Sequence, residues 1–227
     1  KVVEEKDVEK YLESPDSDPR AAAQNGLGVA TGLAVDDQGG SVLSIQVLAV
    51  PGSGQLHLRH QMMETIRDSA ENAYAYVKSK AKELNIPAEK FREVDLHIAF
   101  APAIKIDGPS AGTAMAVAIA SALTGRKVLP GIAMTGEIDL IGRALPIGGL
   151  KKKVTAAERL GYHMVIYPQG NLKGAKKIPQ EVSDGIKLEA VGTAEEAFAL
   201  ALEPVDSDKQ AKKRDGTAFP IAGFKAK

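Results

Sequence analysis

The sequence predicts an α+β fold, a mixed α/β arrangement in which short β-sheets pack against several helices. Three observations support this class. Two apolar stretches rich in β-branched residues, at 26–36 and 41–50, have the composition of paired strands. Residues 59–84 and 111–123 have instead the apolar patterns of helices. Strands and helices alternate along the rest of the chain without a strict β-α-β rhythm, so a regular doubly wound sheet is not expected.

The first half of the chain begins with a predicted β-hairpin. The residues D-Q-G-G at 37–40 suit a turn between the strands at 26–36 and 41–50. A flexible G-S-G loop at 52–54 then precedes the long helix predicted over 59–84, whose apolar stripe has helical spacing. That stripe consists of Met62, Ile66, Ser69, Ala70, Ala73, Val77, Ala81 and Leu84.

The second half starts with a strand that leads into a buried helix. Residues 94–101 alternate between apolar and polar positions, as a half-buried strand does. Residues 111–123 are small and apolar on every side, which predicts a helix buried all round, and Gly125 suits its left-handed C-cap. The remaining predicted elements are short strands within 132–146, a helix over about 150–160 that ends at Gly161, strands at 163–167 and 186–191, and a helix at 194–202.

Composition narrows the function. The chain has 227 residues, enough for one domain with short appendages. Basic and acidic residues balance at 29 each and only 4% of residues are aromatic, so nucleic-acid binding is not indicated. Without cysteine there can be no disulfide, thiol nucleophile or cysteine-ligated metal. The longest apolar run, residues 114–120, is too short to cross a bilayer and no secretory signal is seen, so we expect a cytoplasmic protein without a membrane partner.

A serine on a tight turn is the first candidate site residue. Ser110 lies in the run D-G-P-S-A-G at 107–112, directly before the predicted buried helix. The free backbone N–H groups at the start of that helix could stabilise an oxyanion beside the serine. A serine hydroxyl becomes a useful nucleophile only when a base removes its proton. The same residue would serve equally well as a helix N-cap, so the pattern alone leaves both interpretations open.

Three consecutive lysines are the candidate bases. Lys151, Lys152 and Lys153 open the predicted helix over 150–160, where the helix dipole and the neighbouring lysines both disfavour the cation. A lysine acts as a base only if burial or nearby positive charge lowers its pKa. Spacing alone does not choose among the three, and a solvated surface patch is the ordinary interpretation. The histidines have no triad partner that the sequence identifies; they are His57, His60, His97 and His163.

Three segments, taken together, closely resemble one known family in their order and spacing. They are D-G-P-S-A-G at 107–112, A-M-T-G-E at 133–137 and L-P-I-G-G-L-K-K-K at 145–153. The resemblance is to the proteolytic domain of Lon proteases of the bacterial Lon A type, and it extends from about Gly26 to Leu202. It implies the compact Lon-type α+β fold.

The resemblance also implies a serine–lysine dyad. Ser110 matches the nucleophile of the family, and Lys153, rather than Lys151, matches its general base. Thr135 matches a threonine beside the lysine, and Asp107 matches an acidic residue whose loop can open or close the site. The implied reaction is amide hydrolysis through an acyl-enzyme on Ser110, with no metal or cofactor in this chain. Two positions depart from many bacterial members, which carry an aromatic residue at Val35 and an acid at Gln46.

The resemblance suggests an organisation beyond the catalytic part. Residues 1–25 would be a helical remnant and linker from a preceding ATPase module, 26–203 the proteolytic domain, and 204–227 a flexible basic tail. ATP and magnesium are expected only in that separate module, because this chain has no phosphate-binding G-x-x-x-x-G-K-[ST] loop. Family members with the module form six-membered rings, so a homohexamer is expected.

The predicted function is therefore that of a serine endopeptidase acting on unfolded, damaged or regulatory proteins or on peptides. Two alternatives stay open, a non-catalytic scaffold with a Lon-like fold and an esterase or amidase that uses the same dyad. Such scaffolds lack the serine and the lysine, whereas Ser110 and Lys153 are both present here. We also hypothesise that the edge of the strand ending near Ala101 pairs with an extended substrate backbone.

Overall fold

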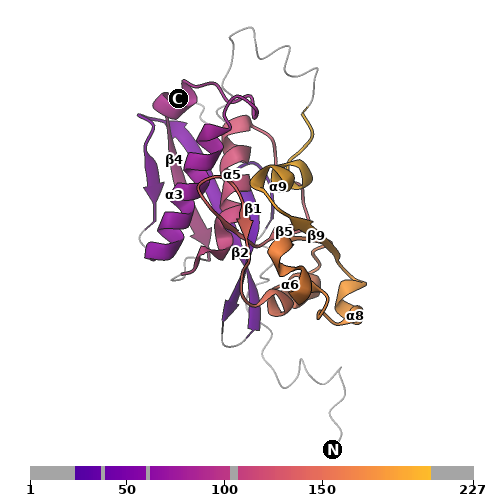
Figure 1. The fold of residues 1–227 in the computed structure, drawn as a ribbon. Helices are drawn as coiled ribbons and strands as arrows, with labels where there is room; N and C mark the ends of the chain where they lie inside the picture. The colour runs from indigo at the N-terminus through magenta and orange to yellow at the C-terminus, as the bar shows by residue number, and fades with distance from the viewer. Residues whose placement is uncertain (1–23, 37–38, 60–61, 103–106, 206–227) are drawn as a thin grey trace, which may run out of the picture.

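The computed structural model describes residues 24–36, 39–59, 62–102 and 107–205. Within these ranges the strands form a seven-stranded and a two-stranded sheet. Helices pack against the larger sheet (Figure 1). The predicted α+β class is confirmed. The predicted N-terminal helix and linker, and the basic tail, lie almost entirely outside the described residues.

The strands of the large sheet are β1 (Val29–Asp36), β2 (Gly39–Pro51), β3 (Leu56–Leu58), β4 (Val94–Ala101), β5 (Ile132–Met134), β8 (Met164–Pro168) and β9 (Lys187–Val191). The small sheet consists of β6 (Glu137–Ile138) and β7 (Ala144–Leu145). The helices are α3 (Glu64–Ser79), α4 (Lys90–Glu93), α5 (Gly112–Thr124), α6 (Leu150–Arg159), α7 (Leu172–Ala175), α8 (Gln180–Ser183) and α9 (Ala194–Ala201). Two 3₁₀ turns, η2 (Pro109–Ala111) and η3 (Gln169–Asn171), precede α5 and α7.

The large sheet has the order β3-β4-β2-β1-β5-β8-β9, and strand pairing along this order is partly antiparallel and partly parallel. The predicted hairpin is confirmed, since β1 and β2 pair antiparallel from Val29 opposite Gln46 to Asp36 opposite Gly39. β4 continues this antiparallel part, whereas β5, β8 and β9 are added in parallel. The parallel strands are joined by crossovers through α6 and through α7 and α8, as parallel pairing requires. The part of the sheet formed by β5, β8 and β9 therefore follows a β-α-β pattern that the sequence analysis did not expect.

Two hydrophobic clusters cover the two faces of the sheet. The larger one joins the sheet to α3, α5 and α9, and α5 is buried on every side, as predicted. The second lies on the opposite face, where Leu33 of β1 and Val42 of β2 meet the apolar side of α6. α6 therefore packs on this face of the sheet, with its apolar side toward β1 and β2. Every helix in the described ranges is too short or too polar to span a lipid bilayer.

The region predicted as one long helix over 59–84 is divided differently. The helix α3 begins at Glu64 and ends at Ser79, and the chain continues through turns past Leu84. Upstream, residues 56–58, for which no element was predicted, form strand β3 beside β4. β3 depends on tertiary contacts, since it pairs with β4 and the Asp95 carboxylate of β4 accepts the N–H groups of Ser53 and Gln55, just before β3, at 2.8 Å each.

The position of β4 in the sheet limits the hypothesis about substrate pairing. β4 pairs with β2 along its whole length and with β3 from Leu96 to Ile98. A strand that is paired on both sides cannot accept another strand there. Since β3 pairs only from Leu96 to Ile98, the hypothesis is now restricted to the residues of β4 close to Ala101.

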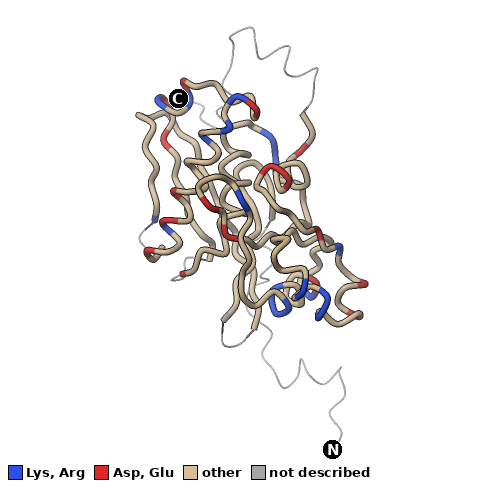
Figure 2. The backbone as a smooth tube through the Cα atoms, in the orientation of Figure 1, with Lys and Arg blue, Asp and Glu red and all other residues tan. Residues whose placement is uncertain are grey.

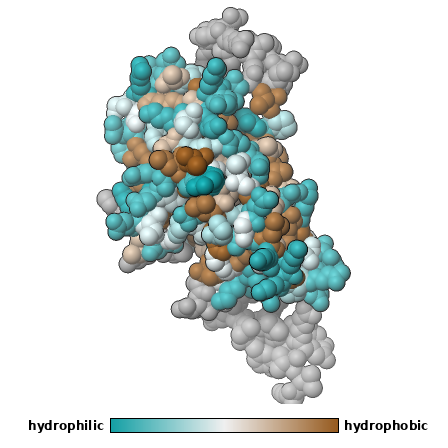
Figure 3. All heavy atoms as spheres, in the orientation of Figure 1, coloured by the Kyte–Doolittle hydropathy of each residue, from teal (hydrophilic) through white to brown (hydrophobic). Residues whose placement is uncertain are grey.

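Surface composition varies over the molecule. The face shown in Figure 3 carries small groups of apolar residues separated by hydrophilic ones. The most exposed large apolar side chains include Leu48, Leu140 and Ile141, each more than 60% exposed. Lys and Arg gather at the end of the molecule that carries α6, as Figure 2 shows.

Candidate active site

Three of the four predicted site residues come together between three elements. Nζ of Lys153 lies 2.9 Å from Oγ of Ser110 and 3.0 Å from Oγ1 of Thr135. Ser110 belongs to η2, Lys153 to α6, and Thr135 follows β5. These residues are far apart along the chain, and the packing of η2, β5 and α6 brings their polar atoms within hydrogen-bonding distance.

The turn that carries Ser110 has a defined backbone. Gly108 has a φ of +95°, a conformation that favours glycine, and Pro109 then occupies the first position of η2. The carbonyl of Ser110 accepts the N–H of Gly136 at 2.8 Å. Gly112 must be small, because a Cβ there would lie 2.7 Å from the backbone nitrogen of Ile138. These contacts fix the serine against the segment between β5 and β6.

The N-cap interpretation of Ser110 is wrong. The N-cap of α5 is Ala111, and no side chain provides a cap hydrogen bond. The first N–H groups of α5 are also not free to stabilise an oxyanion, contrary to the expectation from the sequence. Those of Gly112 and Thr113 already bond to the carbonyls of Pro109 and Gly136. Within η2 only Ser110 and Ala111 carry a backbone N–H group, because Pro109 has none.

The first turn of α6 separates the three lysines. Lys153 is only 3% exposed, whereas Lys151 and Lys152 are exposed. The helix starts after Gly149, which has a φ of +70° and therefore adopts a left-handed conformation. Gly40 of β2 lets the helix approach closely, because a Cβ there would lie 2.1 Å from the carbonyl oxygen of Lys152. The surface-patch interpretation thus holds for Lys151 and Lys152 and fails for Lys153.

Burial changes the acid–base chemistry of Lys153. Desolvation lowers the pKa of its ammonium group to about 8. The sequence also suggested repulsion from neighbouring lysines, but burial is the cause. Its two partners are neutral hydroxyls, which hold the amine in place without adding the negative charge that would raise the pKa. At a pKa near 8, roughly a tenth of the side chain is neutral at pH 7 and able to accept a proton.

Thr135 bridges the nucleophile and the lysine. It is fully buried, and its Oγ1 accepts from Nζ of Lys153 and donates to the carbonyl oxygen of Ser110 at 3.3 Å. Its backbone N–H bonds to the carbonyl of Ile166 in β8. Both hydrogen-bonding capacities of the hydroxyl are therefore directed at the site.

Asp107 is placed at the start of the nucleophile turn. Its side chain is exposed, and Oδ1 accepts the hydroxyl of Thr65 and the N–H of Gly108. Thr65 and Ser69 are residues that sequence analysis missed as site residues. Ser69 was placed in the apolar stripe of the helix, but its Oγ donates to the carbonyl of Pro109 at 3.2 Å. The only sequence signal was their i, i+4 spacing, which puts both hydroxyls on one face of α3.

The two positions that depart from the family pattern lie on the hairpin. Val35 is 40% exposed and lies beside the start of α6, where a Cβ on Gly149 would be 2.9 Å from its Cγ2 atom. Gln46 is exposed on β2, opposite Val29 of β1 and Ala99 of β4. Val35 is thus near the helix that carries Lys153.

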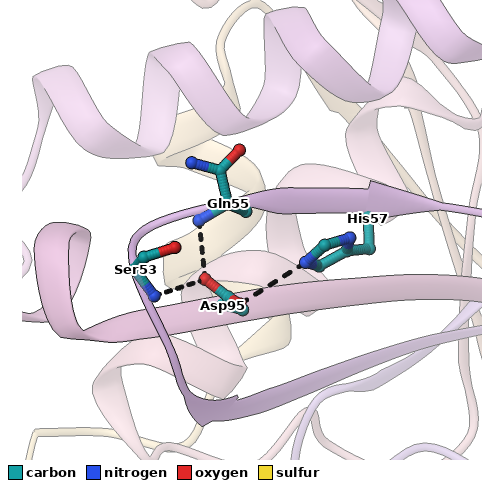
Figure 4. A network of polar contacts seen from close by, with 4 residues as sticks. All are labelled: Ser53, Gln55, His57 and Asp95. Atoms are coloured by element: carbon teal, nitrogen blue, oxygen red, sulfur yellow. Dashed lines mark hydrogen bonds and ion pairs between the residues drawn. The ribbon is translucent and has the colours of Figure 1, made fainter.

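A second polar network lies around Asp95 and organises a loop. Asp95 accepts the N–H groups of Ser53 and Gln55, and Nε2 of His57 lies 3.4 Å from its Oδ2 (Figure 4). The N–H of Gln55 is the largest cause of the lowered pKa of Asp95. The rings of His57 and His97 stack at 4.4 Å. In the part of the chain that the structure describes, no three His, Cys, Asp or Glu side chains are grouped to hold a metal ion.

The chemistry of the buried site suits a hydrolase with serine as nucleophile and lysine as base. Comparison with known proteins gives the family. The family model described as "Lon protease (S16) C-terminal proteolytic domain" matches residues 2–204 of this chain. The chain belongs to this family, whose members are serine peptidases. The resemblance stated from the motifs is confirmed.

Three relatives illustrate the similarity. The Lon protease of Dictyoglomus thermophilum is 44% identical over 204 residues, which are 88% of this chain and 26% of the relative. Lon protease 1 of Thermus thermophilus is 42% identical over 88% of this chain and 25% of its own length. The Lon protease of Desulforamulus reducens is 42% identical over 86% and 24%, respectively. The chain thus spans about a quarter of the length of these relatives.

Proposed function

We propose that this domain is a serine endopeptidase in which Ser110 is the nucleophile and Lys153 the general base. The observation that carries the proposal is the 2.9 Å contact between Ser110 Oγ and the Nζ of a lysine that is 3% exposed. Burial lowers the pKa of this lysine to about 8, which makes the neutral amine accessible near neutral pH. A solvated lysine would not have this property.

The proposed reaction proceeds in two steps, acylation of Ser110 and hydrolysis of the acyl-enzyme. In the first, neutral Lys153 takes the proton of the Ser110 hydroxyl as Oγ attacks the peptide carbonyl carbon, and the lysine then protonates the leaving amine as the C–N bond breaks. In the second, Lys153 takes a proton from water as the water oxygen attacks the acyl-enzyme. The proton returns to Ser110 Oγ when the ester bond breaks, which regenerates the site.

Thr135 and Asp107 have supporting roles in this proposal. Thr135 holds Nζ of Lys153 at 3.0 Å and the carbonyl of Ser110 at 3.3 Å, so it keeps the two catalytic residues in register. Asp107 supports the turn through its contacts with Thr65 and Gly108. The reaction needs no metal or cofactor in this domain, because the serine and the lysine supply the nucleophile and the base.

We further propose the context in which the domain works. The relatives are Lon proteases about four times as long as the matched region, so the domain would act within a longer, ATP-dependent protease whose separate ATPase module binds ATP and magnesium. Unfolded, damaged or regulatory proteins would be the substrates, a homohexameric ring the assembly, and the cytoplasm the compartment. Residues 26–203 would form the proteolytic unit of that chain.

Cleavage of a fluorogenic peptide tests the function. We expect the domain to cleave the peptide without ATP and with EDTA present, and Ser110→Ala and Lys153→Arg to abolish cleavage. Arginine keeps a positive charge but cannot act as a base near neutral pH. Cleavage that persists in Ser110→Ala, or no cleavage by the unchanged domain, would contradict the proposal. Hydrolysis of small esters without peptide cleavage would favour the esterase alternative.

A further inference from the structure

We propose that Thr65 and Ser69 of α3 are positioning residues for Ser110. Their hydroxyl groups clamp the turn that carries the nucleophile and thereby set its distance from Lys153. This inference rests on the proposed function, because it concerns the geometry of the same serine. It assigns to α3 a part in catalysis beyond its packing in the core.

Thr65 uses its hydroxyl twice on the turn. The hydroxyl donates to Oδ1 of Asp107 and accepts the N–H of Gly108 at 3.0 Å. Oδ1 of Asp107 accepts the same N–H at 2.8 Å, so the three groups form a closed ring. Gly108 has a backbone conformation that L side chains rarely adopt. The two hydrogen bonds to its N–H group hold it there, and they therefore fix the direction in which the chain enters Pro109 and Ser110.

Ser69 provides a second point of attachment one helical turn later. Residues four apart lie on the same face of a helix, so Thr65 and Ser69 both face the turn. The Ser69 side chain is buried, and its Oγ donates to the carbonyl of Pro109 at 3.2 Å. The two hydroxyls thus contact three successive residues, 107 to 109, that immediately precede the nucleophile.

The other side of the turn is held by a different element. The N–H of Gly136 donates to the carbonyl of Ser110 at 2.8 Å, and the hydroxyl of Thr135 donates to the same carbonyl. Ser110 is therefore fixed between α3 and the segment after β5, while Lys153 is carried by α6. Loss of the α3 contacts would remove the hydrogen bonds that Thr65 and Ser69 make to residues 107–109 of the turn. A misplacement of about 1 Å at a catalytic group can reduce the rate by roughly a hundredfold.

Loss of the Thr65 contacts should affect catalysis without affecting the folding of the domain. Thr65 and Asp107 are both exposed, so water can replace their hydrogen bonds and global stability depends little on them. A variant that lacks the Thr65 hydroxyl should therefore keep its fold and lose rate. This distinguishes positioning from a purely structural role.

Steady-state peptide cleavage by four variants tests the clamp. Thr65→Val keeps the shape of the side chain and removes the hydroxyl, and we expect kcat to fall roughly tenfold to a hundredfold with KM within about twofold. Thr65→Ser restores the hydroxyl and should recover kcat to within about twofold. Thr65→Ala repeats the loss of the hydroxyl with a better helix former. Thr155→Val makes the same change at an exposed threonine of α6 and should leave kcat and the unfolding temperature unchanged.

Several results would overturn the clamp. One is a kcat for Thr65→Val within twofold of the unchanged domain, and another is a Thr65→Ser variant as slow as Thr65→Val. A fall in kcat that occurs only with a large fall in unfolding temperature, in both the valine and the alanine variants, would show a structural role instead. If the domain cleaves the peptide and Ser110→Ala does not, the proposed function stands whatever Thr65 does. If the unchanged domain does not cleave, the function and the clamp fail together.

Discussion

Lys153 is a cationic side chain in surroundings that disfavour charge. Neighbouring positions on a helix differ by about 100° in direction, so Lys151 and Lys152 remain in water while Lys153 turns toward the sheet. Its burial lowers the pKa to about 8, against an ordinary value of 10.5. One residue position therefore separates a surface lysine from a candidate base.

The activity should depend on pH through this lysine. The reactive form is the neutral amine, whose fraction grows as the pH rises through the pKa. We expect kcat/KM for peptide cleavage to increase about tenfold per pH unit below a midpoint near 8 and to level off above it. A pH–rate profile from about pH 6 to about pH 10 measures this midpoint. A midpoint typical of histidine, or a flat profile, would contradict the assignment of Lys153 as the base.

The same lysine should weaken the fold. Because its pKa is lower in the folded state than in the unfolded state, the unfolded chain binds more protons between about pH 8 and 10.5, and stability rises with pH across that window. Below it, the native state carries the full cost of a buried charge. We expect Lys153→Met to raise the free energy of unfolding at pH 7 by about 1–3 kcal/mol and to lose this advantage as the pH approaches 10.5.

Urea unfolding at several pH values measures this effect. Lys151→Met, a change to an exposed lysine of the same helix turn, is the control and should leave the pH dependence of stability unaltered. A Lys153→Met domain that is less stable than the unchanged protein at pH 7 would show that the contacts of Lys153 with Ser110 and Thr135 outweigh its desolvation.

At the scale of the elements, the site depends on how closely α6 approaches the β-hairpin. Gly40 of β2 faces the backbone of α6, and an added Cβ would lie 2.1 Å from the Lys152 carbonyl oxygen and 2.9 Å from the Ala156 side chain. No real Cβ can occupy that space unless α6 and β2 move apart. A helix that moves away from β2 would take Lys153 with it.

Gly40→Ala should therefore impair both stability and catalysis. We expect it to lower the free energy of unfolding by about 1–3 kcal/mol, the usual cost of overpacking, and to reduce kcat. Gly26→Ala is the matched control, because a Cβ at Gly26 meets no atom within 4 Å. Thermal unfolding and peptide cleavage measure the two effects. Equal behaviour of the two alanine variants would show that the approach of α6 to the hairpin does not set the site.

Sequence patterns predicted the longer elements because these show a period. The hairpin of β1 and β2, the alternation of β4 and the all-round burial of α5 are confirmed. The elements that were missed, namely β3, α4, α7 and α8, have three or four residues each, too few to show a period. β3 depends on pairing with β4, which is distant in sequence, so local patterns cannot indicate it.

The candidate site was predictable in part. The turn around Ser110 is a local feature, and glycine and proline indicated it directly. The choice of Lys153 over its neighbours came from the family resemblance, because burial depends on how α6 docks on the sheet. The contacts of Thr65 and Ser69 were not predicted, because their i, i+4 spacing is a weak signal and hydroxyl side chains on a helix are common. The catalytic roles of Ser110, Lys153, Thr135 and Asp107 stay proposals.

At the scale of the whole molecule, the C-terminal end of the described structure closes the fold. Leu202 is 1% exposed and bridges to Val128, and the backbone of Glu203 bonds to Arg126 and Lys127. The family match also ends at residue 204. The segment around Leu202 therefore belongs to the folded unit.

Truncations should separate this segment from the residues after it. Removal of residues 206–227 should change the free energy of unfolding by no more than about 0.5 kcal/mol and leave peptide cleavage intact. Removal of everything after Leu200 also deletes the buried Leu202 and should cost about 3 kcal/mol or more. Thermal or urea unfolding of both truncations measures the difference. A large loss of stability when only residues 206–227 are removed would show that these residues are part of the fold.

The central claim, that buried Lys153 activates Ser110, is tested most directly by covalent labelling of the serine. The domain is treated with a fluorophosphonate, and peptide mapping by mass spectrometry locates the adduct. We predict an adduct on Ser110 that forms faster as the pH rises through about 8 and is absent in a folded Lys153→Met domain. An adduct on another residue, or equal labelling of Ser110 with and without Lys153, would contradict the account.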